Sequence, residues 1–271
     1  MSTLTKILKP FDRFLPEENR LELIWLLAKM DFSKRYYESI LGLFWALINP
    51  FFKVIIYYVA FTYLIERGRD GIDNFALYLF SGLIVLSFFT EGTNKSLRLL
   101  KKNSYLSENT QFEKMDLFIA AGIGTTLGFV FNVIAFCAFA LLLGEPVPPT
   151  IVFLPVLIFN LFLLVLGLSL ILSTCYIFFK DLQQIWSLST LLFFWTSPIF
   201  FSGEMIANKF PFMPFVQPIF GIIENIRAVL LFGNMPDYFF LAYNYLYAFA
   251  FLALGLWVFR KFEHKALEKL L

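Results

Sequence analysis

The ionisable side chains of this sequence are too scattered to form a recognisable catalytic centre. His264 is the single histidine, and it lies in a charged segment near the end of the chain, so an imidazole metal site is not expected. Glu91 and Glu224 lie near the ends of apolar stretches, where a carboxylate in contact with water is the expected arrangement. A membrane enzyme needs a base or a metal-binding acidic motif, and few residues here could serve.

The chain also carries no motif for using ATP by itself. The sequence G-x-x-x-x-G-K-[ST], whose backbone cradles phosphates, does not occur. Pairs of carboxylates inside apolar stretches, which proton-coupled pumps use as relays, are missing too. We therefore expect a chain that is not an enzyme and that binds no cofactor or metal. Any ATP would have to be handled by a partner.

Lys53 is the one charged residue inside a long apolar stretch, three residues after Pro50. The simpler interpretation is that its ammonium group reaches a nearby membrane surface while its methylene stem stays in hydrocarbon. A position along a transport pathway is the alternative.

The composition places the chain in a membrane. Hydrophobic residues make up 59% and charged residues 15%, against roughly 45–50% and 25% in soluble domains. We predict an all-α polytopic membrane protein with six transmembrane helices, because six stretches approach the length of about 20 residues that crosses hydrocarbon. A cytoplasmic N-terminus over 1–46 would precede a six-span domain over 47–271. The six stretches are 47–65, 75–90, 117–143, 150–178, 185–201 and 241–259.

The distribution of positive charge predicts the orientation. Of the 22 lysines and arginines, 17 fall in the segments that lie inside if the N-terminus is inside. Positive charge is enriched in cytoplasmic loops, so both termini are predicted to be cytoplasmic. The outer segments hold only Arg67, Arg69, Lys209 and Arg227.

Residues 18–32 predict a helix that is too short and too charged to span a membrane. Glu22 and Lys29 share one strip of this helix, whereas Arg20 and Asp31 lie nearly opposite, so the amphipathic pattern is imperfect. We favour a helix lying at the cytoplasmic membrane interface. A helix packed wholly on protein is the alternative.

The longest polar stretch is the inner loop over about 95–116. Thr110 and Glu113 suggest a capping box, which predicts that the third spanning helix begins in the cytoplasm. Such a loop is usually a solvated connection, but apolar residues among its charges also make it a plausible docking surface. Those residues are Tyr105, Leu106 and Phe112.

The outer segment over about 202–240 is too long for a simple turn and too apolar to lie free in water. It carries three prolines before an apolar helix that Glu224 and Arg227 interrupt, one turn apart. We predict short re-entrant or surface-lying helices between the fifth and sixth spans, because irregular backbone at membrane depth needs protein or a cavity around it.

Aromatic residues are abundant in the predicted spans. Most rings must face lipid or fill the core, but rings that face a lumen could stack on sugar faces. Small residues repeat at i, i+4 and i+8 in the third span, at Ala120, Gly124 and Gly128, and packing within the chain is their expected role. The candidate rings are Tyr57, Tyr58, Tyr63, Phe193, Phe194 and Trp195.

Four stretches, taken together and in this order, resemble the permease subunits of ATP-binding-cassette exporters for polysaccharides and polyol phosphates. This family includes the O-antigen, teichoic acid and capsule exporters, and the resemblance covers nearly the whole chain. The stretches are RYYESILGLFWALINPFFKV (35–54), FFKDLQQIWSLSTLLFFWTSPIFF (178–201), QPIFGIIENIRAVLLFGNMP (217–236) and LGLWVFRKFEHKALEKLL (254–271).

The resemblance implies a homodimer in the bacterial cytoplasmic (inner) membrane, with two separate ATPase subunits that bind ATP and Mg. A lipid-linked polysaccharide would pass between the two permeases, and no nucleic acid is involved. ATP binding would draw the ATPases together, move the inner loops as levers and open the interface between the first and fifth spans.

The resemblance also assigns roles to the unusual segments. It makes 18–32 the interface helix, 103–114 the segment that couples to the ATPase, and 204–232 the outer gate with Glu224 and Arg227. The coupling loop departs from the family, since relatives carry a Phe-Pro-Arg-like run where this chain reads QFEKM. The coupling residues implied are Tyr105, Leu106, Phe112, Glu113 and Lys114.

Three rivals remain open at this stage. The same scaffold could export a drug or a small lipid. The chain could instead be a membrane-embedded enzyme of envelope polymer synthesis, or a scaffold subunit with no pathway of its own.

Overall fold

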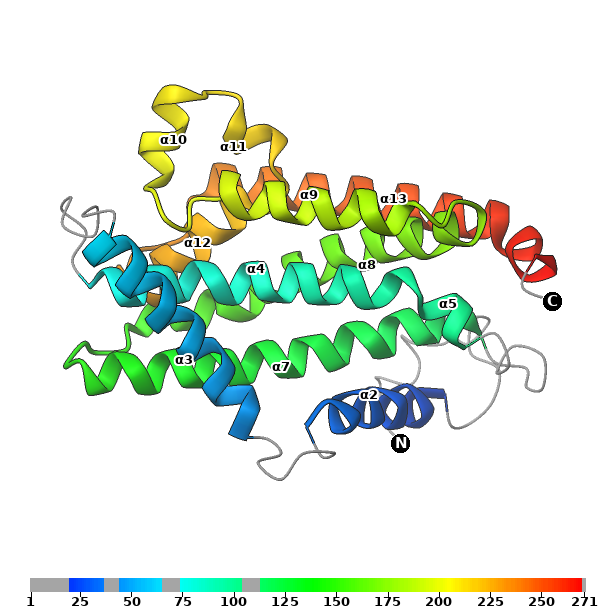
Figure 1. Ribbon diagram of the computed structural model, residues 1–271, viewed down its shortest axis with the longest axis horizontal. Helices are drawn as coiled ribbons and strands as arrows, with labels where there is room; N and C mark the ends of the chain where they lie inside the picture. Colours follow the sequence, from blue (N-terminus) through cyan, green and yellow to red (C-terminus); the bar gives the residue numbers. More distant parts are fainter. Residues whose placement is uncertain (1–19, 37–43, 65–73, 104–112, 270–271) are drawn as a thin grey trace, which may run out of the picture.

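The computed structural model describes residues 20–36, 44–64, 74–103 and 113–269, and all its regular elements within them are helical. The long helices lie side by side along the long axis of the molecule, with α10 to α12 at one end and α5 at the other (Figure 1). The helices are α2 (Arg20–Tyr36), α3 (Phe44–Val59), η2 (Ala60–Leu64), α4 (Phe75–Leu97), α5 (Leu99–Lys102), α7 (Lys114–Leu142), η3 (Pro149–Phe153), α8 (Leu154–Phe178), α9 (Leu182–Thr196), α10 (Gly203–Lys209), α11 (Met213–Val216), α12 (Phe220–Leu230) and α13 (Tyr238–Glu268).

Four helical segments are long and apolar enough to cross a membrane: Phe75–Leu97, Lys114–Leu142, Pro149–Phe178 and Tyr238–Glu263. They coincide with four of the six predicted stretches, so a membrane protein with several spanning helices is confirmed. The second stretch was drawn too short, because the helix continues past residue 90 to Leu97.

The other two predicted spans are short helices. The first comprises α3 followed by the π-helical turn η2. The fifth, α9, has 15 residues, or about 22 Å at 1.5 Å per residue, against hydrocarbon about 30 Å thick. It ends at Thr196, five residues before the predicted end, because Pro198 cannot donate the next helical hydrogen bond and disfavours helical backbone in the residue before it.

Helix α4 forms the centre of the core. Phe80 and Phe89 on α4 have no exposed surface. The ring of Phe80 lies 5.4 Å from that of Phe51 on α3 and 5.7 Å from that of Phe136 on α7. These edge contacts fix α3 and α7 against α4, because rings prefer such tilted packing.

Helices α8 and α13 touch through their backbones. A Cβ atom built on Gly255 of α13 would lie 2.4 Å from the carbonyl oxygen of Gly167 on α8. A Cβ on Gly167 would lie 2.5 Å from the backbone nitrogen of Leu252. Only glycine permits this approach, which the close packing of helices in membranes exploits.

Helix α2 lies along the first turns of α7 (Figure 1), with Ile24 and Ala28 packed against Ala120. A Cβ on Gly124 would lie 3.4 Å from the carbonyl oxygen of Ala28. The prediction that Ala120 and Gly124 pack within the chain is therefore confirmed. The other side of α2 exposes Leu21, Leu23, Trp25, Leu26 and Met30, so α2 is not packed wholly on this chain.

The predicted capping box, with Thr110 as the N-cap of the third spanning helix, is wrong, because the helix begins three residues later. Glu113 is itself the N-cap of α7, and its side chain makes no capping hydrogen bond. Its carboxylate binds Arg20 instead. Thr110, the other proposed member, lies outside the described residues.

Candidate functional site

An aromatic cluster joins α3 to the C-terminal end of α9. Phe200, in the connector after α9, is buried and stacks on Phe61 of η2 with 4.2 Å between ring centroids. Tyr57 of α3 lies 5.4 Å from Phe200 and 5.6 Å from Phe194. Trp195 lies 5.7 Å from Phe200. The cluster holds two short helices together at one edge of the molecule.

The six predicted rings divide into three pairs. Phe193 packs inward, with its ring 5.8 Å from that of Phe89, and Tyr58 contacts Phe75 at 6.4 Å. Tyr57 and Phe194 are half-buried in the cluster. Tyr63 and Trp195 are 69% and 55% exposed, respectively. These last two are therefore the rings most free to meet a molecule outside this chain.

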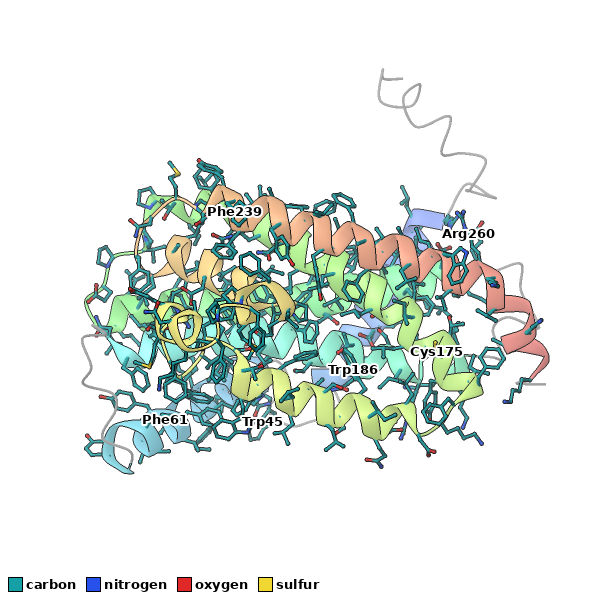
Figure 2. The ribbon with its side chains drawn as sticks, turned by 90° about the horizontal axis from the view of Figure 1, so that it is seen from above. Trp45, Phe61, Cys175, Trp186, Phe239 and Arg260 are labelled. Atoms are coloured by element: carbon teal, nitrogen blue, oxygen red, sulfur yellow. The ribbon has the colours of Figure 1, made fainter. Side chains whose placement is uncertain are left out.

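The outward faces of α3 and α9 form a bare apolar surface, called here the α3–α9 edge. Among the residues of α9, only Trp186 is buried. Figure 2 shows this edge, marked by Trp45 and Phe61, on the side of the molecule opposite to Arg260. Such a surface needs lipid or another protein to cover it. Its exposed members are Phe52, Ile55, Ile56, Val59 and Tyr63 on α3 and η2, and Ile185, Leu188, Leu191, Leu192 and Trp195 on α9.

A small cavity of about 240 Å³ opens between the end of α9 and the α10–α11 segment. Its wall combines aromatic rings with one ammonium group, that of Lys209, which has no carboxylate within ion-pair distance among the described residues. A ring and a cation side by side can hold a polar or anionic group on an apolar wall. The lining residues are Trp195, Thr196, Phe201, Met205, Ile206, Lys209, Phe210 and Met213.

Arg227 of α12 is a completely buried cation that connects three elements. Its guanidinium donates hydrogen bonds to the carbonyl oxygen of Pro198 at 2.6 Å and to Oε1 of Glu224 at 2.7 Å. The group also lies 3.5 Å above the centre of the Tyr78 ring on α4. A buried charge is tolerated when it is paired and hydrogen-bonded in this way. Arg227 thus fixes the connector after α9 against α4 and α12.

Two glycines make room for this ion pair. A Cβ on Gly82 would lie 3.2 Å from a guanidinium nitrogen of Arg227, and one on Gly203 would lie 2.8 Å from the carboxyl carbon of Glu224. Gln217 also binds the end of α9. Its amide donates to the carbonyl oxygen of Phe193 at 3.0 Å and to Oγ of Ser197 at 2.5 Å. The end of α9 is therefore held by two polar side chains from the α11–α12 region.

At the other end of the molecule, Arg20 attaches α2 to the start of α7. Its Nε donates to Oδ2 of Asp116 at 2.8 Å and its Nη2 to Oδ1 at 2.6 Å, and it also binds Glu113. Desolvation lowers the pKa of Arg20, but hydrogen bonding and attraction to Asp116 and Glu113 raise it overall. Lys95 of α4 donates to Asp31 of α2 at 2.8 Å.

The comparisons with known proteins now decide the family. The model of the ABC-2 type transporter family matches residues 22–231, from the first turn of α2 to the end of α12. The chain belongs to the ABC-2 type transporter family. The resemblance found in the sequence is thereby confirmed.

Relatives of this ABC-2 chain match along nearly their full lengths. The O-antigen export system permease protein RfbA of Klebsiella pneumoniae is 26% identical over 248 residues, covering 91% of this chain and 94% of the relative. The protein of the same name from Myxococcus xanthus is 23% identical, covering 78% and 81%. The polysialic acid transport protein KpsM of Escherichia coli is 24% identical, covering 88% and 92%.

Of the five predicted coupling residues, the structure describes Glu113 and Lys114. Tyr105, Leu106 and Phe112 lie outside the described residues. Glu113 binds Arg20, and Lys114 donates to Glu263 of α13 at 3.0 Å. These two residues therefore connect the start of α7 to the first and last described helices.

Sequence reasoning missed several partners in this ABC-2 chain. Glu224 and Arg227 were singled out, and the structure brings them together, but nothing in the sequence pointed to Tyr78 or Gln217. Arg20 and Asp116 were likewise overlooked as a pair because 96 positions separate them. No local signal pointed to this pair, since both residues stand among other charged residues in the sequence.

Proposed function

We propose that this chain is the permease subunit of a bacterial ATP-binding-cassette exporter that moves a lipid-linked polysaccharide of the O-antigen or capsule class across the cytoplasmic membrane. The observation that carries the proposal is that relatives named for O-antigen export and polysialic acid transport match about nine-tenths of this chain and of their own lengths. Relatives that align over about nine-tenths of both lengths share an architecture, so the same task fits this chain.

The proposed topology has six spans and both termini in the cytoplasm. The four long helices support it, with α3 and α9 as the first and fifth spans. The short α9 would be completed by the Arg227-held connector and by α10 to α12, which form the outer gate. With this topology, α2 lies at the inner surface with its exposed apolar side toward lipid.

The proposed assembly is a homodimer in which the two α3–α9 edges face each other. The edge is apolar and uncovered in one chain, and a second copy gives the cover that it needs. The polymer would pass between the copies, where the exposed rings of Tyr63 and Trp195 offer flat faces to sugars.

Energy would come from two ATPase subunits that bind ATP and Mg and contact the loop preceding α7. This loop leads directly into Glu113, which Arg20 ties to α2, so a displacement of the loop moves α2 and α7 together. ATP can shift this equilibrium only by binding the closed ATPase pair more tightly than the open pair.

The test is an affinity purification of the full chain from its native membrane, with mass spectrometry of the co-purifying proteins and sugar analysis of the cell surface in a deletion strain. We expect a stoichiometric ATPase with a Walker motif and loss of a surface polysaccharide. An ATPase without any change in surface polysaccharide would indicate a drug or small-lipid exporter. Absence of the ATPase would refute the exporter itself.

A further inference from the structure

A shallow hollow of about 560 Å³ lies on the outward side of α13. Residues of a single stripe form it, recurring at intervals of three and four along the helix. The hollow and the α3–α9 edge are on opposite sides of the molecule, as the positions of Arg260 and Trp45 show (Figure 2). The lining residues are Ala253, Leu256, Trp257, Arg260 and Lys261.

The hollow has an apolar half and a cationic half. Ala253, Leu256 and Trp257 lie within the uninterrupted apolar part of α13, and the charged part of the helix begins at Arg260. The hollow therefore crosses the level at which hydrocarbon gives way to headgroups. Trp257 is 55% exposed, which suits an indole at that level.

No described side chain neutralises the two cations. No carboxylate of the described residues lies within ion-pair distance of Arg260 or Lys261. Glu263, the nearby acid whose side chain is described, binds Lys114 at 3.0 Å instead. The ammonium nitrogen of Lys261 lies 4.6 Å from the centre of the Trp257 ring, which orients it over the hollow by a cation–π contact.

We propose that this hollow binds one anionic phospholipid. Its phosphate is held by Arg260 and Lys261, and the start of an acyl chain lies on Leu256 and Trp257. Basic residues at this level attract anionic headgroups, each contributing to the affinity, and an apolar wall directly beside them selects a phosphate that carries a lipid tail. In the topology proposed above, the lipid belongs to the inner leaflet.

A phospholipid fits better than the lipid-linked substrate, because the hollow faces away from the α3–α9 edge. It also fits better than a water-soluble protein partner, since three of the five lining residues lie at hydrocarbon depth. Binding of an anionic lipid needs only that α13 crosses a membrane, whereas the choice of leaflet and the exclusion of the lipid-linked substrate rest on the proposed function.

The experiment is native mass spectrometry of the full-length chain in non-ionic detergent, titrated with phosphatidylglycerol or with phosphatidylcholine of the same acyl chains. We expect phosphatidylglycerol to bind more tightly to the parent chain. In the double variant R260Q/K261Q its affinity should fall about 10- to 30-fold. The swap variant R260K/K261R keeps both charges and should stay within about threefold of the parent.

The matched control is K265Q/K269Q, which removes the same charge beyond the hollow, from Lys265 of α13 and from Lys269 directly after it. Equal losses in both double variants would show general attraction and overturn the site. The proposal also fails if polyprenyl diphosphate displaces phosphatidylglycerol from the hollow. It fails as well if phosphatidylcholine binds as tightly, or if only binding of the ATPase subunit is lost in R260Q/K261Q.

Discussion

At the scale of single residues, Trp195 is notable because its ring touches protein, borders a cavity and is also exposed. It contacts the Phe200 cluster, borders the 240 Å³ cavity and is still 55% exposed. A ring held in place by protein on one side and free on the other can stack on a passing sugar without losing conformational freedom.

Replacing Trp195 with alanine should therefore reduce export of the polysaccharide about three- to tenfold while leaving the amount of folded chain unchanged. The measurement is surface polysaccharide by blotting, normalised to the chain in the membrane. The control is F249A on α13, an aromatic residue of similar exposure (53%) on the other side of the molecule. Equal export from W195A and F249A would remove Trp195 from the pathway.

Arg227 has a structural role that its neighbours define. Replacing it with methionine would leave Glu224 and the carbonyl oxygen of Pro198 without their partner, at a cost of about 3 kcal/mol. Lysine should recover little, because it lacks the planar fork that reaches both oxygens. The melting temperature of the purified chain in detergent tests this. R98M is the control, since Arg98 is exposed and, among the described residues, its guanidinium donates only to Gln183. An equal drop in both variants contradicts the role.

At the scale of elements, α2 is joined to the bundle by charge at both of its ends. Arg20 binds Asp116 near one end, and Asp31 binds Lys95 near the other, with Ile24 and Ala28 packed between. Because both partners at the first end are nearly buried, this ion pair is worth more than one on an open surface.

Reversing one charge, in R20D or in D116R, should release α2 from α7, and the double variant R20D/D116R should restore the attachment. Limited proteolysis within α2 reports the release, and the expected increase in cleavage rate is about tenfold or more. The control K114A breaks the ion pair with Glu263 and should leave α2 protected. If the double variant is cleaved as fast as the single ones, Arg20 and Asp116 do not act as a pair.

The contact between α8 and α13 depends on two glycines. Alanine at Gly255 would place a Cβ atom against backbone, which cannot move aside, so the helices must separate. We expect the melting temperature to fall by about 3–10 °C. G122A is the control, because there the Cβ atom meets the ring of Phe162, a side chain that can rotate. A larger drop in G122A than in G255A would contradict this account.

At the scale of the whole molecule, the α3–α9 edge and the outward face of α13 are both exposed, lie on opposite sides and suit different binding partners. The α3–α9 edge is mainly apolar, with Lys53 as its one exposed charge among the described residues, whereas the face of α13 changes from apolar to basic at Arg260. The first suits a second copy of the chain and the second suits lipid.

Single cysteines can distinguish these faces. After replacement of the free thiols Cys137 and Cys175 with alanine, L188C on α9 should cross-link two copies in native membranes. L246C on α13 should not, although Leu188 and Leu246 are almost equally exposed, at 68% and 69%. A gel under non-reducing conditions provides the readout. Cross-linking through L246C but not through L188C would place the dimer interface at α13 and contradict the prediction.

The sequence by itself determined the class and most of the elements. Hydrophobic length gave four of the spanning helices directly, since burial in hydrocarbon requires long apolar runs whatever their neighbours are. Residue order along the chain also determined the family. Small residues at Ala120 and Gly124 predicted a close helix contact, although the partner, α2, was not foreseen.

Only the tertiary structure decided how distant polar residues combine. Arg227 with Tyr78, and Arg20 with Asp116, are separated by 149 and 96 positions, and no local pattern connects them. It also decided where Glu113 acts, as an N-cap bound to Arg20 rather than as part of a capping box. The physical reason is that hydrophobic periodicity is a local property of the chain, whereas the partner of a buried charge depends on which helices pack together.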